Sequence, residues 1–297
     1  MKQSLVLLFL LAACPPRGTG SNTGPSGNAA TGISPDSCGT INTTATGRKL
    51  YAFLVASAEL DRTTTELENS IRDACRKMAM DLGVSPEGDT KTVCNTAAME
   101  LQANMKVSIK TEKQMVTRTT PPVCHTDVSL ATSFAAECEG QASGSVKGTC
   151  EGGTQTGNQC NGYTNVDASA ECKASAEVHA TTHTECTPGH VEVVQQDVTV
   201  IDASKWAKAQ AAINDGMPQL MLAGMKLQLA GKAAIAWAQT GEQFAQSAGD
   251  LAADLGEKAV CVAGQVAGIV AAVGQIQARF EVSVQVSASF SATAGAQ

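Results

Sequence analysis

Two regions of the chain alternate between apolar and polar residues with the period of a β-strand. Even positions over residues 128–146 and 166–180 are apolar or small, whereas most odd positions are polar. Alternation with a period of two is typical of a strand that buries one face. We therefore predict two long strands within residues 107–202.

Six cysteines in this region are spaced symmetrically, with separations of 14, 12, 10, 12 and 14 residues. Pairing from the outside inward makes the residue numbers of each pair add to 310, which is the register condition of an antiparallel hairpin. Even separations place all three pairs on one face of the ribbon. The expected disulfides are Cys124–Cys186, Cys138–Cys172 and Cys150–Cys160. They would stabilise a two-stranded ribbon that is marginal in water by itself.

A helical hairpin is predicted before the ribbon, in residues 48–106. Apolar residues recur at steps of three and four from residue 50 to residue 82, as on one face of a helix. Gly83 ends this helix, and Ser85-Pro86-Glu87 begins a second one. Cys75 and Cys94 lie about equally far from the turn, so we expect them to form a disulfide.

The residue pattern over 203–278 predicts further helices, at about 203–214, 217–240 and 242–278. Breaks are expected near Gly216-Met217-Pro218 and at Gly241. Residues 279–297 alternate again and could add a third strand to the ribbon. Cys38 and Cys261 are then left to pair. The expected fold class is α+β, with a long disulfide-stapled hairpin packed against helical hairpins.

The segment 259–278 is uncharged over twenty residues and allows two interpretations. It is long enough to enter a membrane, and Gly264 with Gly268 forms a small-residue pair of the kind found between membrane helices. Against this, three glutamines interrupt it and its larger apolar residues follow the spacing of a core helix. We favour a buried helix.

The pattern of the N-terminal residues predicts a signal for export of the protein. Lys2 precedes an apolar run of about seven residues, which is too short to span a bilayer. The run ends in Leu11-Ala12-Ala13-Cys14, which resembles the lipobox of bacterial lipoprotein precursors. This resemblance covers residues 1–14 and implies that residues 1–13 are removed and that Cys14 carries the lipid. The alternative is an ordinary signal peptide with a chance cysteine.

A flexible tether is expected to follow the anchor, over residues 14–47. This stretch is rich in Gly, Pro, Ser, Thr and Asn and contains almost no large apolar side chains, so it cannot offset the entropy of folding. Cys38 would pin its end to the folded body. Pro15 follows the anchor, where inner-membrane lipoproteins often carry Asp, so the resemblance favours the outer membrane.

The sequence contains no recognisable catalytic motif, and we predict that the protein is not an enzyme. His179 and His183 have the spacing of a zinc-protease helix, but Ala180 replaces the catalytic Glu. On a strand the two rings would lie about 13 Å apart, too far for one ion. His125, Asp127, His183 and Glu185 would cluster across the ladder and allow weak adventitious binding. We therefore expect no metal site and no cofactor.

The amino-acid composition limits the classes of partner that this protein could bind. The net charge of −7 disfavours nucleic acid, and two Trp, two Tyr and six Phe supply few rings for stacking. Eleven cysteines indicate an oxidising compartment. Two function classes remain: a non-catalytic, lipid-anchored envelope protein that acts as a scaffold, spacer or adhesion module, or a membrane-active protein that inserts its hairpin or apolar helix on oligomerisation. Expected partners are the membrane, a second copy of the chain or another envelope protein.

Overall fold

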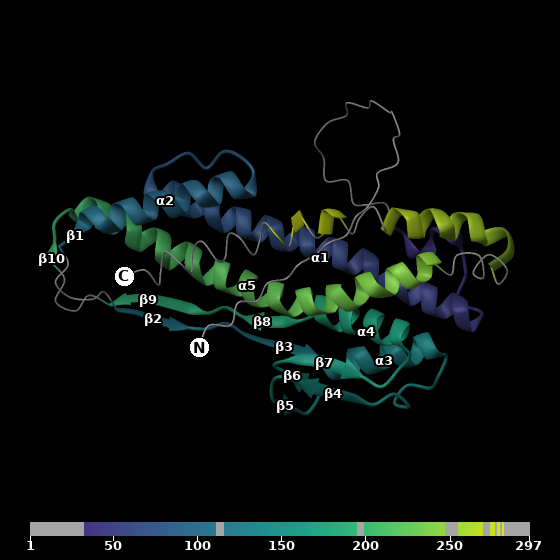
Figure 1. The fold of residues 1–297 in the computed structure, drawn as a ribbon. Coiled ribbons are helices and arrows are strands. Elements are labelled where there is room, and N and C mark those ends of the chain that lie inside the picture. Colours follow the sequence, from purple (N-terminus) through teal and green to yellow (C-terminus); the bar gives the residue numbers. More distant parts are fainter. Residues whose placement is uncertain are drawn as a thin grey trace, which may run out of the picture.

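Two long antiparallel helices form the frame of the molecule, as Figure 1 shows. The computed structural model describes residues 33–110, 116–194, 199–246, 255–269, 274–276, 278–279 and 281. Within them, helix α1 spans Ala45–Leu82 and helix α5 spans Ala203–Gln246. Shorter helices are α2 (Thr90–Ser108), α3 (Val128–Glu139), α4 (Ala170–Thr182) and an apolar helix, Gly256–Ile276. Short 3-10 turns lie at Pro35–Cys38 and Gly256–Lys258.

Glycines allow α1 and α5 to pack closely along their length. A Cβ on Gly216 would lie 2.1 Å from Cγ of Met78, and a Cβ on Gly241 would lie 3.0 Å from Cζ of Phe53. The two contacts are 25 residues apart in both helices, so the pair stays in register over about 37 Å. These glycines therefore serve helix packing.

The predicted breaks in the C-terminal helices are wrong, because α5 continues through Pro218 and Gly241. Proline removes one backbone hydrogen bond and is costly in an isolated helix. Here α5 packs against α1, α2 and α4, and tertiary contacts outweigh local preference.

Helices α1 and α2 form the expected hairpin, closed by Cys75–Cys94. Gly83 ends α1 with a left-handed φ of 81°, and its N–H bonds to carbonyls of the last turn. The predicted start of α2 at Ser85 is wrong. Asp89 caps the helix instead, since its Oδ1 accepts the backbone N–H of Thr92 at 2.7 Å.

The chain between α2 and α5, residues 109–202, begins as the predicted antiparallel ladder. Strand β2 (Val116–Thr120) pairs with β9 (His190–Val194), and β3 (Val123–Asp127) pairs with β8 (Glu185–Thr187). Arg118 faces Glu192, in the predicted register. A two-residue ladder of β1 (Ile109–Lys110) and β10 (Thr199–Val200) is shifted by one position, so that Ile109 faces Val200.

The prediction of one continuous ribbon is wrong, because α3 and α4 replace its middle. Buried residues of α3 recur at 128, 131, 135 and 138, the spacing of a helix face. Asp127 caps α3 through the N–H of Ser129, and Gly140 ends it with a φ of 69°. Alanine favours helix, so small even-numbered residues did not indicate a strand here.

Beyond α3 the chain turns back in short strands. Strand β4 (Gly148–Glu151) pairs with β7 (Tyr163–Val166), and β5 (Gln155–Thr156) pairs with β6 (Gln159–Cys160). Strand β6 also pairs with β3, giving a sheet of order β5-β6-β3-β8. Gly148 faces Val166, so the predicted register is lost at the tip.

The apolar core lies along the two long helices. One cluster joins α1, α2 and α5 around Ile71, Met78 and Trp206; another surrounds Phe53 and Trp237. Val178 of α4 is fully buried in the second cluster, so the chain between α2 and α5 shares the core of the two long helices. Mixed helix and strand content is compatible with the predicted α+β class.

The tether predicted over residues 14–47 is too long at its C-terminal end. Cys38 and Ile41 are buried in the cluster around Phe53, and α1 already begins at Ala45. Ile33 and Ile41 pack on this cluster, and together with the Cys38 disulfide they dock the end of this polar segment. The predicted C-terminal strand, residues 279–297, lies outside the described residues except for positions 279 and 281, which are helical.

Candidate functional site

The body of the protein is closed by five disulfides, which pair the cysteines as expected: three from their symmetric spacing, one from its position about the helical turn and one by elimination. They are Cys38–Cys261, Cys75–Cys94, Cys124–Cys186, Cys138–Cys172 and Cys150–Cys160. Cys14, the expected lipidation residue, lies outside the described residues.

The Cys38–Cys261 disulfide joins the end of the N-terminal segment to the apolar helix Gly256–Ile276. Two polar contacts accompany it: Ser34 donates its backbone N–H to Oε1 of Gln265 at 2.9 Å, and Lys258 donates to the carbonyl of Thr40. This segment is therefore fixed to the last described helix by covalent and polar contacts.

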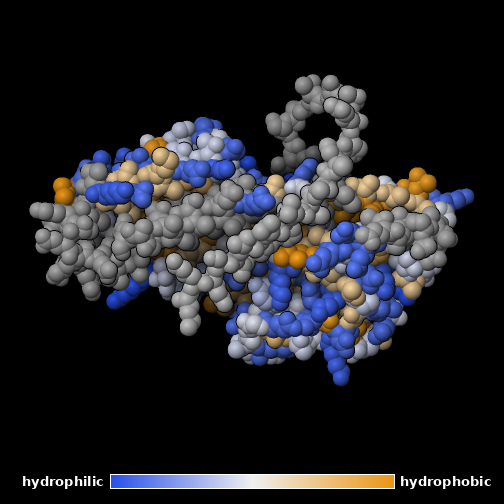
Figure 2. Space-filling view, viewed as in Figure 1, coloured by the Kyte–Doolittle hydropathy of each residue, from blue (hydrophilic) through white to orange (hydrophobic). Residues whose placement is uncertain are grey.

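Helix Gly256–Ile276 is the one helix among the described residues that is long and apolar enough to cross a membrane. Its Val262, Val266 and Ile269 are buried in the cluster around Phe53 and Trp237. Its other face is open, with Val260 84% exposed, and Figure 2 shows an apolar surface where this helix lies. The helix thus packs by one face, and only 29% of its apolar window is buried, so the expected buried helix is observed in part.

A histidine–carboxylate cluster lies where α4 packs on α1. Nδ1 of His179 is 2.9 Å from Oε2 of Glu59, and the rings of His179 and His183 are 4.6 Å apart between centroids. Donor atoms of Glu59, His179 and His183 all lie within 4.8 Å of one another. The expected ring separation of about 13 Å assumed a strand. It is wrong because this segment is a helix, which stacks residues i and i+4 on one face.

The other predicted acid–histidine grouping is divided. His125 faces Glu185 in the β3–β8 ladder, whereas Asp127 faces Gln159 and caps α3. His183 instead lies at the end of α4 beside His179. Among the described residues, a group that could hold one ion is formed by Glu59 with the two α4 histidines.

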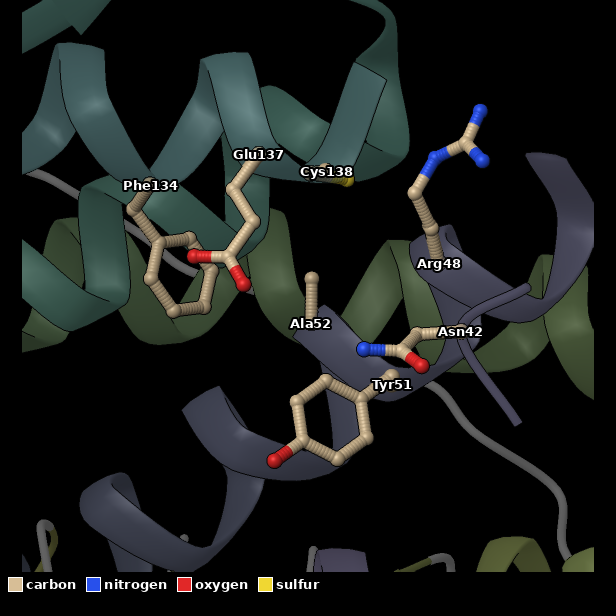
Figure 3. A pocket seen from close by; sticks show the side chains of 7 residues that line it. All are labelled: Asn42, Arg48, Tyr51, Ala52, Phe134, Glu137 and Cys138. Carbon is tan, nitrogen blue, oxygen red and sulfur yellow. The ribbon is translucent and has the colours of Figure 1, made fainter. Parts of the chain in front are cut away.

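A small, open depression lies between α1 and α3, shown in Figure 3. Its lining residues are Asn42, Arg48, Tyr51, Ala52, Phe134, Glu137 and Cys138. Burial, followed by the hydrogen bond to Asp36, raises the pKa of Tyr51, so this phenol stays protonated at neutral pH. The lining combines a phenol, a guanidinium and a carboxylate without a nucleophile activated by a neighbouring base.

Sequence reasoning missed Glu59. It lies on α1, 120 residues before His179, and is one of several acidic residues on that helix. The available signal was the pair His179 and His183, which share a face only on a helix.

Comparison with known proteins finds no matching family model, no matching curated protein and no matching solved structure.

Proposed function

We propose that this protein is a non-catalytic, lipid-anchored protein of the bacterial cell envelope that acts as a rigid spacer, scaffold or adhesion module. Cys14 is its membrane anchor, and the outer membrane is its location. The observation that carries this proposal is the Cys38–Cys261 disulfide, which joins the segment after the anchor directly to the folded body.

The shape and bonding of the body suit a spacer. Helix α5 has 44 residues and is about 66 Å long, and α1 packs beside it. Five disulfides restrict the unfolded chain and favour an oxidising compartment outside the cytoplasm. A long, cross-linked body joined to the anchor by a flexible tether suits a spacer or scaffold.

Lipidation is tested with the variant Cys14→Ser in a bacterial host. The unchanged protein should incorporate a fatty-acid analogue and fractionate with membranes, whereas Cys14→Ser should accumulate as unprocessed precursor without label. Cys38→Ser is the matched control and should still be labelled. Normal labelling of Cys14→Ser would contradict the proposed anchor.

The apolar helix favours a second candidate, a membrane-active protein. Val260 is an exposed large apolar residue near the start of the uncharged segment 259–278. Insertion of a β-hairpin is no longer supported, since residues 128–139 and 170–182 are helical. The remaining route is insertion of Gly256–Ile276.

Dye release from liposomes separates the two candidates. We expect residues 15–297, which lack the signal segment and the anchor, to release no dye, because most of the larger apolar residues of Gly256–Ile276 face the core. Release that is abolished by Val260→Asp but kept in Ile201→Asp would favour the membrane-active protein. Ile201 is a suitable control because it is 62% exposed and lies before α5.

A further inference from the structure

We propose that Glu59, His179 and His183 form a binding site for a divalent transition-metal ion, with Zn²⁺ as the preferred ion. The site joins α1 to α4, an inter-helix contact that none of the five disulfides bridges. This inference is independent of the anchor and of the scaffold function.

The two histidines are positioned by one turn of helix. Residues i and i+4 lie above one another, so α4 presents both imidazoles on the side that faces α1. The three donor atoms lie within 4.8 Å of one another. Ligands of a tetrahedral zinc ion lie about 3.4 Å apart, given bonds of about 2.0–2.1 Å. Small side-chain rotations would therefore close the site, without any movement of the helices.

Each imidazole is oriented by a second contact. Nδ1 of His183 lies 2.8 Å from the carbonyl oxygen of His179, so it donates a proton there and leaves Nε2 with a free lone pair. Such a bond fixes the tautomer of a metal-binding histidine. The ring of His179 stacks on Phe134 with centroids 4.3 Å apart, which limits its rotation.

The donor set selects the class of ion. Two imidazoles and one carboxylate suit Zn²⁺ and neighbouring transition metals, whereas Ca²⁺ and Mg²⁺ require oxygen ligands. The side chains of Glu59 and His179 are only 17% and 19% exposed, while His183 is exposed and gives the ion access. Three protein ligands leave a fourth position for water.

The experiment uses the chain from residue 15 onward, which contains every described residue, without a polyhistidine tag and after treatment with a chelator. Zn²⁺ is titrated by calorimetry, and Co²⁺ is titrated as a spectroscopic probe of tetrahedral nitrogen and oxygen ligands. We expect one equivalent to bind. His183→Gln should weaken binding at least tenfold, and Glu59→Gln should weaken it as well. Combining His179→Gln with His183→Gln should abolish it.

The chain provides matched controls in its two other histidines. His125→Gln and His190→Gln should leave the affinity and stoichiometry unchanged. An NMR titration of the protein without substitutions does not depend on whether the variants fold. One equivalent of Zn²⁺ should shift the imidazole signals of His179 and His183 alone. Failure of the unvaried histidines to bind Zn²⁺, or binding that shifts His125 or His190 instead, would overturn the proposal.

Discussion

Glu139 shows how one side chain can connect two helices. It is the last residue of α3, and its Oε1 accepts the backbone N–H of Ser169 at 2.7 Å. Ser169 is the cap residue of α4, but its own side chain makes no capping hydrogen bond. The carboxylate of α3 therefore supplies the negative charge that stabilises the N-terminus of α4. Hydrogen bonding from Ser169 lowers the pKa of Glu139.

This contact predicts a pH-dependent effect of Glu139→Gln. Because the pKa of Glu139 is lower in the folded than in the unfolded chain, the ionised carboxylate stabilises the fold above its unfolded pKa of about 4.3. That contribution is lost as the pH falls through the folded value. Urea unfolding at about pH 7 should show a less stable variant, and the difference should shrink below about pH 4.

Glu137→Gln is the matched control, since Glu137 is an exposed residue of the same helix. It should change the free energy of unfolding little at either pH. An effect of Glu139→Gln that is equal at both pH values would show that charge is not the reason.

The ribbon pattern could not predict which residues far apart in the sequence pair with one another. On a ribbon, Glu139 would face Glu171 and require relief from Lys173. In the structure Lys49 of α1 pairs with Glu171 at 3.3 Å, and Glu139 bonds to Ser169. The packing of α4 against α1 and α3, which is not encoded in any one segment alone, decides these pairs and also brings Glu59 to His179.

At the scale of elements, the disulfide spacing predicted topology better than it predicted secondary structure. Residue numbers with a constant sum describe any two antiparallel segments, whether strands or helices. Cys138–Cys172 therefore forms between α3 and α4 as readily as it would between strands. The helix signals were present in Asp127 and Gly140, which cap and end α3. Alternating small residues concealed them, because alanine fits either periodicity.

The packing of α4 predicts the effect of Ala174→Trp. Ala174 is 3% exposed, and α4 packs against α1, α3 and α5. A large ring there should overpack the core and destabilise the protein by roughly 1–3 kcal/mol or more. Because Val178 of the same helix belongs to the core of the long helices, their circular dichroism signal should melt at a lower temperature.

Ser133→Trp tests whether the effect of Ala174→Trp depends on burial. Ser133 is exposed on α3, so the same ring should leave the melting temperature nearly unchanged. Helix melting that is unaffected by Ala174→Trp would mean that α3 and α4 are energetically independent of α1 and α5.

At the scale of the whole molecule, the disulfides close loops of very different length. Cys150–Cys160 spans 10 residues at the tip, whereas Cys38–Cys261 spans 223 and encloses nearly all the described chain. In the loop-entropy account of disulfides, the cross-link of the longest loop restricts the unfolded chain most. The pairing of Cys38 with Cys261 could be predicted only by elimination, since no local pattern connects them.

Removing the longest cross-link should cost stability throughout the molecule. The double variant Cys38→Ser and Cys261→Ser should lower the free energy of unfolding by about 2–4 kcal/mol in denaturant titrations. The pair Cys150→Ser and Cys160→Ser, at the tip, is the comparison and should cost less. Equal losses would indicate that strain or local packing, and not loop length, determines the contribution of each bond.

The Cys38–Cys261 disulfide also decides how the protein would carry mechanical load. If the chain before Cys38 is held at a membrane and the chain beyond Cys261 is pulled, tension passes through the sulfur–sulfur bond and bypasses the residues between them. Within the enclosed loop of 223 residues, Cys75–Cys94 and Cys124–Cys186 keep 19 and 62 residues closed. The remaining chain, about 140 residues, would reach roughly 480 Å if fully extended. That length stays stored while the bond is intact, so the protein would respond to pulling as a short tether instead of an extensible spring.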